Sequence, residues 1–130
     1  MTIKRIHSGG AFEEKIGYCR AVVAGDWVHV SGTVCGLHPD TGEETEDPAA
    51  QCRGILAIIE KALSEAGCQM SDVVRVTYML EDRDEFPACW PILTKAFGDN
   101  PPAATMIECG LIDARFRIEI EVTAYKPAAV

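Results

Sequence analysis

Glu119 and Glu121 stand two residues apart in a segment that alternates apolar and polar residues from Phe116 to Tyr125. This period of two is typical of a β-strand with one buried face, and both carboxylates belong to the polar face. The pattern alone favours ordinary solvated groups over a functional pair, because carboxylates usually lie at the surface. A single strand cannot bury its apolar row, so the rest of the chain must supply a sheet and a helical cover.

Six cysteines and three histidines are the other residues that could bind a metal or act as nucleophiles. The cysteines are 16 to 21 residues apart with no C-x-x-C pair, and the histidines do not complete a ligand set, so no metal site is predicted. Reduced, mostly buried thiols are the plain interpretation. His29 shares a strand face with Ser31 but is more typical of a packed or surface residue. Cys109 has no recognisable base partner.

Composition indicates a soluble globular protein. The chain has 130 residues, 48% hydrophobic and 25% charged, which predicts one domain over residues 1–130. No apolar run approaches the roughly 20 residues that cross a bilayer. The basic pair near the N-terminus is not followed by a signal-peptide core, so we expect a cytoplasmic protein without a membrane partner. The net charge is −8 and the basic residues are scattered, which argues against nucleic acid as a partner.

The first half of the chain predicts a hairpin preceded by a short strand. Residues 3–6 suit a strand, and residues 11–15 suggest a loop or a single turn. Strands are expected over 18–23 and 27–32, joined by a tight turn at Gly25, because glycine supplies the positive φ that such turns need.

The clearest helix lies between Asp47, a typical N-cap residue, and Gly67, a typical terminating residue. Its apolar residues recur at steps of three and four, which indicates one face packed on a sheet. Residues 71–80 follow as a strand, on which Val74, Val76, Tyr78 and Leu80 are expected to share a face.

A second helix is expected over residues 85–97, with Pro91 kinking or restarting it. Strands over 105–109 and 116–125 complete the chain. This order predicts an α+β fold: a mostly antiparallel six-stranded sheet with two helices packed on one face. The second face also carries apolar or aromatic residues, among them Tyr18, Trp27 and Met79, so we expect oligomer contacts there.

Taken in order and spacing, these residues resemble the RidA/YjgF family of reactive-intermediate deaminases, formerly the endoribonuclease L-PSP family. The matching segments are 17–22 (GYCRAV), 25–33 (GDWVHVSGT), 39–43 (PDTGE), Asp47 with Gln51, 66–67 (AG), 72–77 (DVVRVT), 84–86 (DEF), 102–105 (PAAT) and 118–121 (IEIE). The resemblance implies a chorismate-mutase-like fold. It also implies a homotrimer with three clefts between subunits that bind small molecules, without a cofactor.

Active members of this family hydrolyse enamines and imines of 2-keto acids to the keto acid and ammonia. Carried over by resemblance, the pocket tyrosine is Tyr18, the serine of the Val-Ser-Gly strand is Ser31 with Gly32 behind it, and the water-handling glutamate is Glu119. A carboxylate is suited to this task because it can orient or deprotonate a water molecule.

The sequence departs from the family at the substrate-binding arginine. In a Pro-Ala-Arg-Ser/Thr segment the arginine pairs with the substrate carboxylate; here its position is Ala104, followed by Thr105. The position just beyond the arginine that is often cysteine in the family is Met106 here, and a helix position that is often asparagine aligns with Trp90. Loss of such a charged anchor costs roughly 2–5 kcal/mol of binding if nothing replaces it. This places the chain in a divergent subgroup whose substrate differs from simple 2-imino acids.

One hypothesis is that Arg20 supplies the missing cation from another part of the cleft. The alternative is that Arg20 pairs with a carboxylate such as Glu119 or Glu121. Arg115 and Arg117 are weaker candidates. Two functions therefore remain open: a divergent imine or enamine deaminase that uses Glu119 and water, and a non-catalytic trimer that binds a small metabolite. Ribonuclease or chaperone activity has little support from the acidic charge balance.

Overall fold

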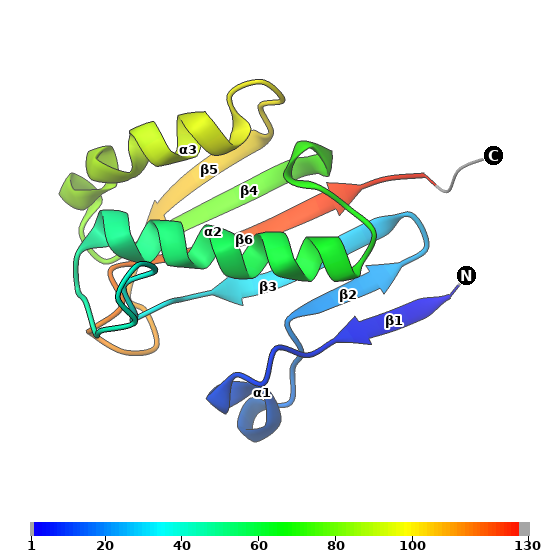
Figure 1. Cartoon of the computed structure of the whole chain (residues 1–130), viewed down its shortest axis with the longest axis horizontal. Helices are drawn as coiled ribbons and strands as arrows, with labels where there is room; N and C mark the ends of the chain where they lie inside the picture. The colour runs from blue at the N-terminus through cyan, green and yellow to red at the C-terminus, as the bar shows by residue number, and fades with distance from the viewer. Residues whose placement is uncertain (1, 128–130) are drawn as a thin grey trace.

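The computed structural model describes residues 2–127. A six-stranded sheet runs in the order β1-β2-β3-β6-β4-β5, and all neighbours are antiparallel except β4 and β5, which are parallel. The strands are β1 (Ile3–Ile6), β2 (Ala21–Ala24), β3 (Trp27–Thr33), β4 (Val73–Leu80), β5 (Ala103–Glu108) and β6 (Ile118–Tyr125). Figure 1 shows α2 (Pro48–Glu65) and α3 (Trp90–Phe97) over one face of the sheet. The predicted α+β fold is confirmed.

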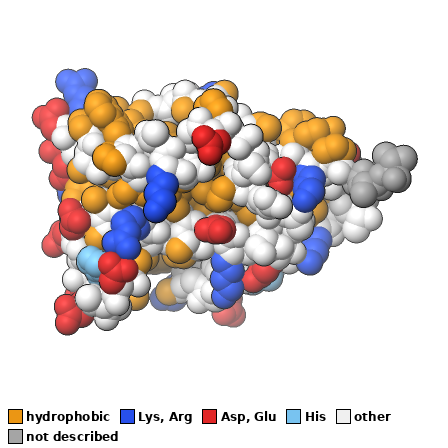
Figure 2. Space-filling view, turned by 45° about the horizontal axis from the view of Figure 1, so that its top comes forward, with side chains coloured by type: hydrophobic (Ala, Val, Ile, Leu, Met, Phe, Trp, Pro, Cys, Tyr) orange, Lys and Arg blue, Asp and Glu red, His pale blue; other side chains and the backbone are white. Residues whose placement is uncertain are grey.

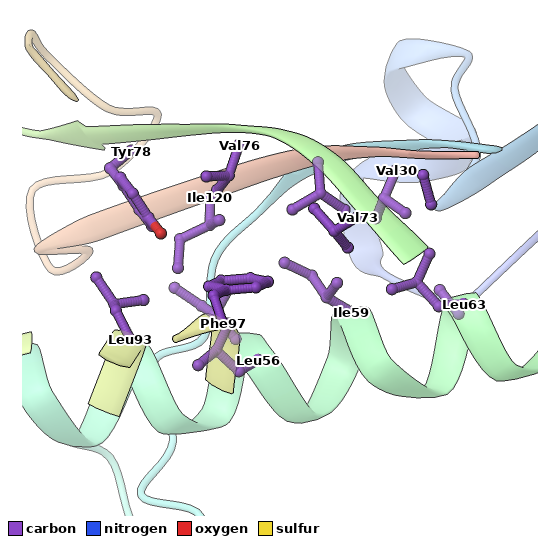
Figure 3. Close-up of a cluster of buried hydrophobic side chains, with 14 of the residues drawn as sticks. Val30, Leu56, Ile59, Leu63, Val73, Val76, Tyr78, Leu93, Phe97 and Ile120 are labelled. Atoms are coloured by element: carbon purple, nitrogen blue, oxygen red, sulfur yellow. The ribbon is translucent and has the colours of Figure 1, made fainter. Parts of the chain in front are cut away.

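The last strand, β6, is central because it pairs with both β3 and β4. Its alternate residues Ile118, Ile120, Val122 and Ala124 are buried, as the alternation predicted. These side chains belong to the same buried cluster as the apolar stripe of α2, in which Ile55, Ile59 and Leu63 are fully buried. Figure 3 shows Ile59 and Leu63 pointing from α2 toward the sheet. Full burial of one such side chain stabilises the fold by about 1.5–3 kcal/mol.

The caps of α2 explain its bounds. The Asp47 side chain accepts a hydrogen bond from the Ala50 amide at 3.1 Å, and Pro48 occupies the first helical position, where an amide proton is not needed. At the other end Gly67 adopts φ 81°, and the Cys68 amide reaches back to the Leu63 carbonyl at 2.8 Å. This closing turn requires a left-handed residue, which glycine provides at little cost. The predicted helix is confirmed.

Two segments differ from the sequence-based expectation in their helical content. Residues 11–15, expected as a loop or a single turn, form α1 (Ala11–Ile16), which ends at Gly17. The second helix is two pieces: a 3₁₀ helix over Arg83–Cys89, then α3 from Trp90, with Pro91 in its first turn. The proline starts a new helix here because its ring cannot continue the ladder of the preceding one.

On β4 the predicted position of Val74 on the core face is wrong. Val74 is 43% exposed, whereas Val73 is 3% exposed. The register against β6 shifts between Val73 and Arg75, so one extra residue is accommodated and the alternation resumes at Val76. The bulge moves Val74 to the open face, away from the helices.

The open face of the sheet carries aromatic side chains at one end. Trp27 and Tyr125, paired across β3 and β6, have ring centroids 4.7 Å apart and are both exposed. Such a patch is typical of a protein contact surface, so oligomer contact there remains a prediction.

Charges are mixed on the side of the molecule seen in Figure 2. Among the described residues visible there, Lys and Arg side chains are scattered between acidic ones. Over residues 2–127, no helix has the length and apolar character that a membrane span needs.

Candidate functional site

The residues predicted for the site fall into two groups on one chain. Tyr18, Arg20, Ser31, Gly32 and Glu119 surround an irregularity in β3, where the pairing with β6 shifts between Val30 and Thr33. We call this group the bulge half-site. Trp90 and Ala104 lie at α3 and β5, on the far edge of the sheet, and line a cleft that we call the edge half-site. Three strand spacings separate β3 from β5, which corresponds to about 14 Å.

Glu119 lies directly against the backbone of Gly32. A Cβ atom placed on Gly32 would collide with Glu119 Oε2. Position 32 therefore requires glycine, because only a residue without a side chain lets the carboxyl group approach this closely. The β3 irregularity and the central position of β6 fix the two residues relative to each other.

The carboxyl group of Glu119 is half-buried and has no hydrogen-bond partner among the described residues. Burial raises the pKa of Glu119, the charge of Glu121 raises it further, and the charge of Arg20 lowers it, with a net increase. A carboxyl group with a raised pKa is a stronger base than an ordinary glutamate, which suits a general base and acid.

Arg20 is buried, with 7% of its surface exposed, and nearly every donor of its guanidinium is engaged. Nη1 donates to the Gly32 carbonyl at 2.8 Å and to the Thr33 hydroxyl at 3.0 Å. Nε donates to the Ser8 hydroxyl at 3.3 Å, and Nη2 to the Tyr18 hydroxyl at 3.3 Å. Arg20 thus ties the segment before α1 to the irregular part of β3.

The carboxylate nearest to Arg20 is Glu13, with Nη2 and Oε2 3.8 Å apart. Sequence reasoning named Glu119 and Glu121 as partners, and neither forms an ion pair with Arg20. Arg20 still acts on Glu119 at longer range, because its charge lowers the pKa of that carboxyl group.

Glu13 is the buried acid that sequence reasoning missed. Its carboxylate accepts hydrogen bonds from the Ser8 hydroxyl, the Ser8 amide and the Gly10 amide. Burial raises the pKa of Glu13, but these hydrogen bonds and the charge of Arg20 outweigh it, so the pKa is lowered. The available signal was a glutamate three residues after Gly10, a spacing typical of a helix start.

Tyr18 and Ser31 were both predicted to line the pocket, and the hydroxyl of each forms a hydrogen bond with a residue nearby in the fold. The Ser31 hydroxyl donates to the Cys19 carbonyl at 2.7 Å. Tyr18 precedes β2, which begins at Ala21 and not at residue 18 as predicted, and its hydroxyl accepts the hydrogen bond from Arg20.

At the edge half-site, Ala104 lies on the helix side of β5, opposite Val76 of β4. Thr105 points to the other face, where its hydroxyl accepts a hydrogen bond from Arg75 Nη2 at 2.7 Å. The structure therefore does not bring the Thr105 side chain together with Ala104. Arg75, a cation that sequence reasoning did not consider, is opposite Thr123, about 13 Å along β6 from Glu119.

The weaker cation candidates also have their own carboxylates. Arg117 donates from Nε to Glu85 at 2.8 Å and from Nη2 at 3.2 Å, and Arg115 lies 3.6 Å from Asp113. His29 contacts the Thr123 hydroxyl at 3.4 Å on the open face. No cluster of three metal-ligating side chains occurs among residues 2–127.

Comparison with known proteins agrees with this fold. The family model for Endoribonuclease L-PSP matches residues 9–126, and the chain belongs to this family, also called RidA/YjgF. A RutC family protein of Pyrococcus abyssi is 32% identical over 110 residues, covering 84% of this chain and 86% of that protein. An uncharacterized protein of Streptomyces coelicolor is 31% identical over 127 residues, covering 97% and 94%.

Solved structures give the same result. The crystal structure of a YjgF/YER057c/UK114 family member from Mycobacterium tuberculosis superposes with a TM-score of 0.86 at 35% identity, covering 96% of this chain and all of that one. A YjgF family protein from Neisseria meningitidis gives a TM-score of 0.80 at 27% identity, with 99% and 98% coverage.

Proposed function

We propose that this protein hydrolyses small imines or enamines, with Glu119 handling the water molecule. The observation that carries the proposal is the state of this one carboxyl group: half-buried, raised in pKa, held against Gly32 and without a partner among the described residues. The other charged groups of the bulge half-site are engaged with one another. Glu119 is therefore the group there that is free to bind water.

The chemistry requires one group that both accepts and returns a proton. The Glu119 carboxylate takes a proton from water as the oxygen bonds to the carbon of C=N and the π-electron pair moves to nitrogen; the carboxylic acid then gives that proton to the nitrogen, which leaves a neutral carbinolamine. In the second half, the carboxylate takes the proton of the carbinolamine hydroxyl and passes it to the nitrogen, the C–N bond breaks, ammonia leaves, a carbonyl forms, and Glu119 is again ionised. A raised pKa makes the Glu119 carboxylate a stronger base than an ordinary glutamate, which favours the first proton transfer.

We further propose that the site is completed between copies of the chain, in a homotrimer. The two half-sites are about 14 Å apart on one chain, by strand spacing. One small ligand cannot contact both, unless a neighbouring copy brings its edge half-site to this chain's bulge half-site. The exposed Trp27 and Tyr125 pair supports an oligomer, since exposed aromatic patches are typical of protein contacts.

A non-catalytic metabolite-binding trimer is the second candidate, and the saturation of Arg20 favours it. With its donors directed at Gly32, Thr33, Ser8 and Tyr18, this arginine offers little to a substrate carboxylate. A protein without a carboxylate anchor would hydrolyse 2-imino acids poorly whatever its affinity for other ligands.

Ammonia release separates the two candidates. We would compare 2-iminobutyrate and 2-aminoacrylate, generated in situ, with an uncharged imine such as the N–H imine of acetophenone. We expect wild type to accelerate hydrolysis of the uncharged imine, and Glu119→Gln to lose about 100-fold or more of that rate.

Glu60→Gln is the matched control, because it makes the same charge change on the exposed side of α2 and should retain full activity. Hydrolysis by Glu119→Gln at the wild-type rate would contradict the proposed role of Glu119. A wild type that matches buffer for every imine would favour the binding protein.

A further inference from the structure

We propose that the edge half-site binds an uncharged, apolar group that carries one hydrogen-bond acceptor, held by the hydroxyl of Tyr78. The proposal concerns the class of ligand bound at the position of the family arginine. That this ligand is also a substrate rests on the proposed function; that it binds does not.

The lining of the cleft is aromatic and aliphatic. It measures about 410 Å³, within the range of small-molecule sites. Tyr78, Phe86 and Trp90 form a continuous row, with ring centroids 5.2 Å and 6.2 Å apart, and Trp90 meets Phe86 edge-on at 87°. Leu93, Met106 and Ala104 complete the apolar wall. Apart from the Tyr78 hydroxyl, no lining side chain carries an ionisable group.

Trp90 is 55% exposed, although it is one of the two tryptophans of the chain. A large aromatic surface left in water offers favourable burial to any apolar group that covers it. The row of rings makes this surface suitable for a planar ligand, because aromatic groups pack well face to edge.

The Tyr78 hydroxyl is the most buried of the polar side-chain groups in this cleft that have no hydrogen-bond partner; the other, Thr94, is exposed. Tyr78 is 7% exposed, and its hydroxyl forms no hydrogen bond within the described part of the chain. Every fully enclosed side-chain nitrogen or oxygen of the described residues has a partner, so the Tyr78 hydroxyl, which has none, keeps some exposed surface, and Tyr78 is one of the residues that line the cleft. Figure 3 shows Tyr78 extending from β4 into the space above Leu93.

This hydroxyl is a donor over the whole physiological range. Burial, with smaller effects from Cys52 and Cys89, raises the pKa of Tyr78 to about 12, so the proton stays on oxygen. A carbonyl oxygen or imine nitrogen of a ligand could accept a hydrogen bond from this hydroxyl.

A carboxylate is a poor ligand for the same cleft. Ala104 offers no charge, and the nearby cation Arg75, on β4, donates a hydrogen bond to Thr105 on the opposite face of the sheet. A desolvated anion without a cation is strongly disfavoured in apolar surroundings. The cleft therefore selects against the charge that an arginine at position 104 would have favoured.

Trp90 provides a direct measurement of binding. In a Trp27→Phe background, Trp90 is the sole tryptophan, and its fluorescence can be titrated with benzamide and with benzoate. These probes have the same shape, but benzamide is neutral and benzoate is an anion. We expect a saturable change with benzamide and a Kd for benzoate at least about tenfold weaker, equivalent to ~1.4 kcal/mol.

Two variants test the contacts. Tyr78→Phe should raise the Kd for benzamide about fivefold to tenfold, the effect of one lost hydrogen bond. The variant should still fold, because phenylalanine keeps the ring of Tyr78 in place. Ala104→Arg should reverse the preference in favour of benzoate. The proposal is overturned if benzoate binds as well as benzamide, if Tyr78→Phe binds benzamide as wild type does, or if neither probe reaches Trp90 because another copy of the chain covers it.

The experiment also separates this inference from the proposed function, because it requires no turnover. Selective benzamide binding without ammonia release from any imine would support the cleft and reject the hydrolase. Turnover of carboxylate imines with a preference for benzoate would do the opposite.

Discussion

The two half-sites differ in how their polar groups are satisfied. In the bulge half-site, Arg20 and Glu13 are buried 3.8 Å apart, and both form hydrogen bonds to neighbouring groups. The Glu119 carboxyl group there has no hydrogen-bond partner among the described residues. In the edge half-site the surroundings are mostly apolar, and the largely buried Tyr78 hydroxyl has no hydrogen-bond partner among the described residues. The bulge half-site is thus held by a network of charged and polar groups, and the edge half-site by packing of aromatic and aliphatic side chains.

The charge network of the bulge half-site is the part most easily broken. Glu13→Ala removes the carboxylate beside buried Arg20, and breaking a buried ion pair costs about 3–5 kcal/mol. Because Arg20 keeps its bonds to Gly32 and Thr33, we expect the lower end, about 3 kcal/mol, in urea unfolding.

Glu14→Ala is the control for this change, since Glu14 is exposed on the same helix, and its unfolding midpoint should match wild type. Equal midpoints for the two variants would show that Glu13 does not hold Arg20 in place.

A smaller change tests the close approach of Glu119 to the backbone. Gly32→Ala forces the Glu119 carboxyl group to move, and overpacking of this kind costs about 1–3 kcal/mol. The Glu119 pKa, followed by carbon-13 NMR, should fall toward its ordinary value as the group moves into water.

Gly110→Ala serves as the comparison, because a Cβ there meets nothing within 4 Å and the φ of Gly110 is not in the left-handed region. If Gly32→Ala leaves both the stability and the Glu119 pKa unchanged, the contact described between these two residues is wrong.

The smallest effect is on the pH dependence of stability. The raised pKa of Glu119 means that its contribution to stability is full below the ordinary glutamate range and is lost as the pH rises through the raised value. Glu119→Gln should therefore raise Tm at neutral pH and flatten the decline that wild type shows on that side.

Calorimetry from about pH 4 to about pH 8 would measure this, with Glu13→Gln as the opposite case. Glu13 has a lowered pKa, so its stabilisation is present above the ordinary range and is lost as the pH falls through the lowered value. A Glu119→Gln protein that is less stable than wild type at neutral pH would refute the sign for Glu119.

Local sequence patterns were sufficient for the frame that positions these groups. The alternation in β6 and the caps at Asp47 and Gly67 act within one or two turns of the chain, so the pattern determines the element directly. The exception is Val74, where the β4 bulge reverses the alternation. A bulge depends on the partner strand, and β6 lies more than forty residues further along the chain.

The site itself was predictable only through its residue types. Resemblance supplied Glu119 and Gly32, and the structure adds the steric reason for their pairing. The partner of Arg20 could not be predicted, because Glu13 reaches it through a fold of the segment before β2 that has no sequence period. Tyr78 was assigned to the core face correctly, but its unpartnered hydroxyl depends on the shape of the packed cleft.

The placement of the two half-sites in the sheet has a consequence for the evolution of this protein. Glu119 lies on a central strand with neighbours on both sides, where most substitutions disturb the core. Ala104 lies on the edge strand β5 and is exposed, so its side chain can be exchanged at little cost to folding. If the proposed roles hold, substitution at this margin would change which molecules are recognised, while the strand that carries Glu119 is retained from one descendant to the next.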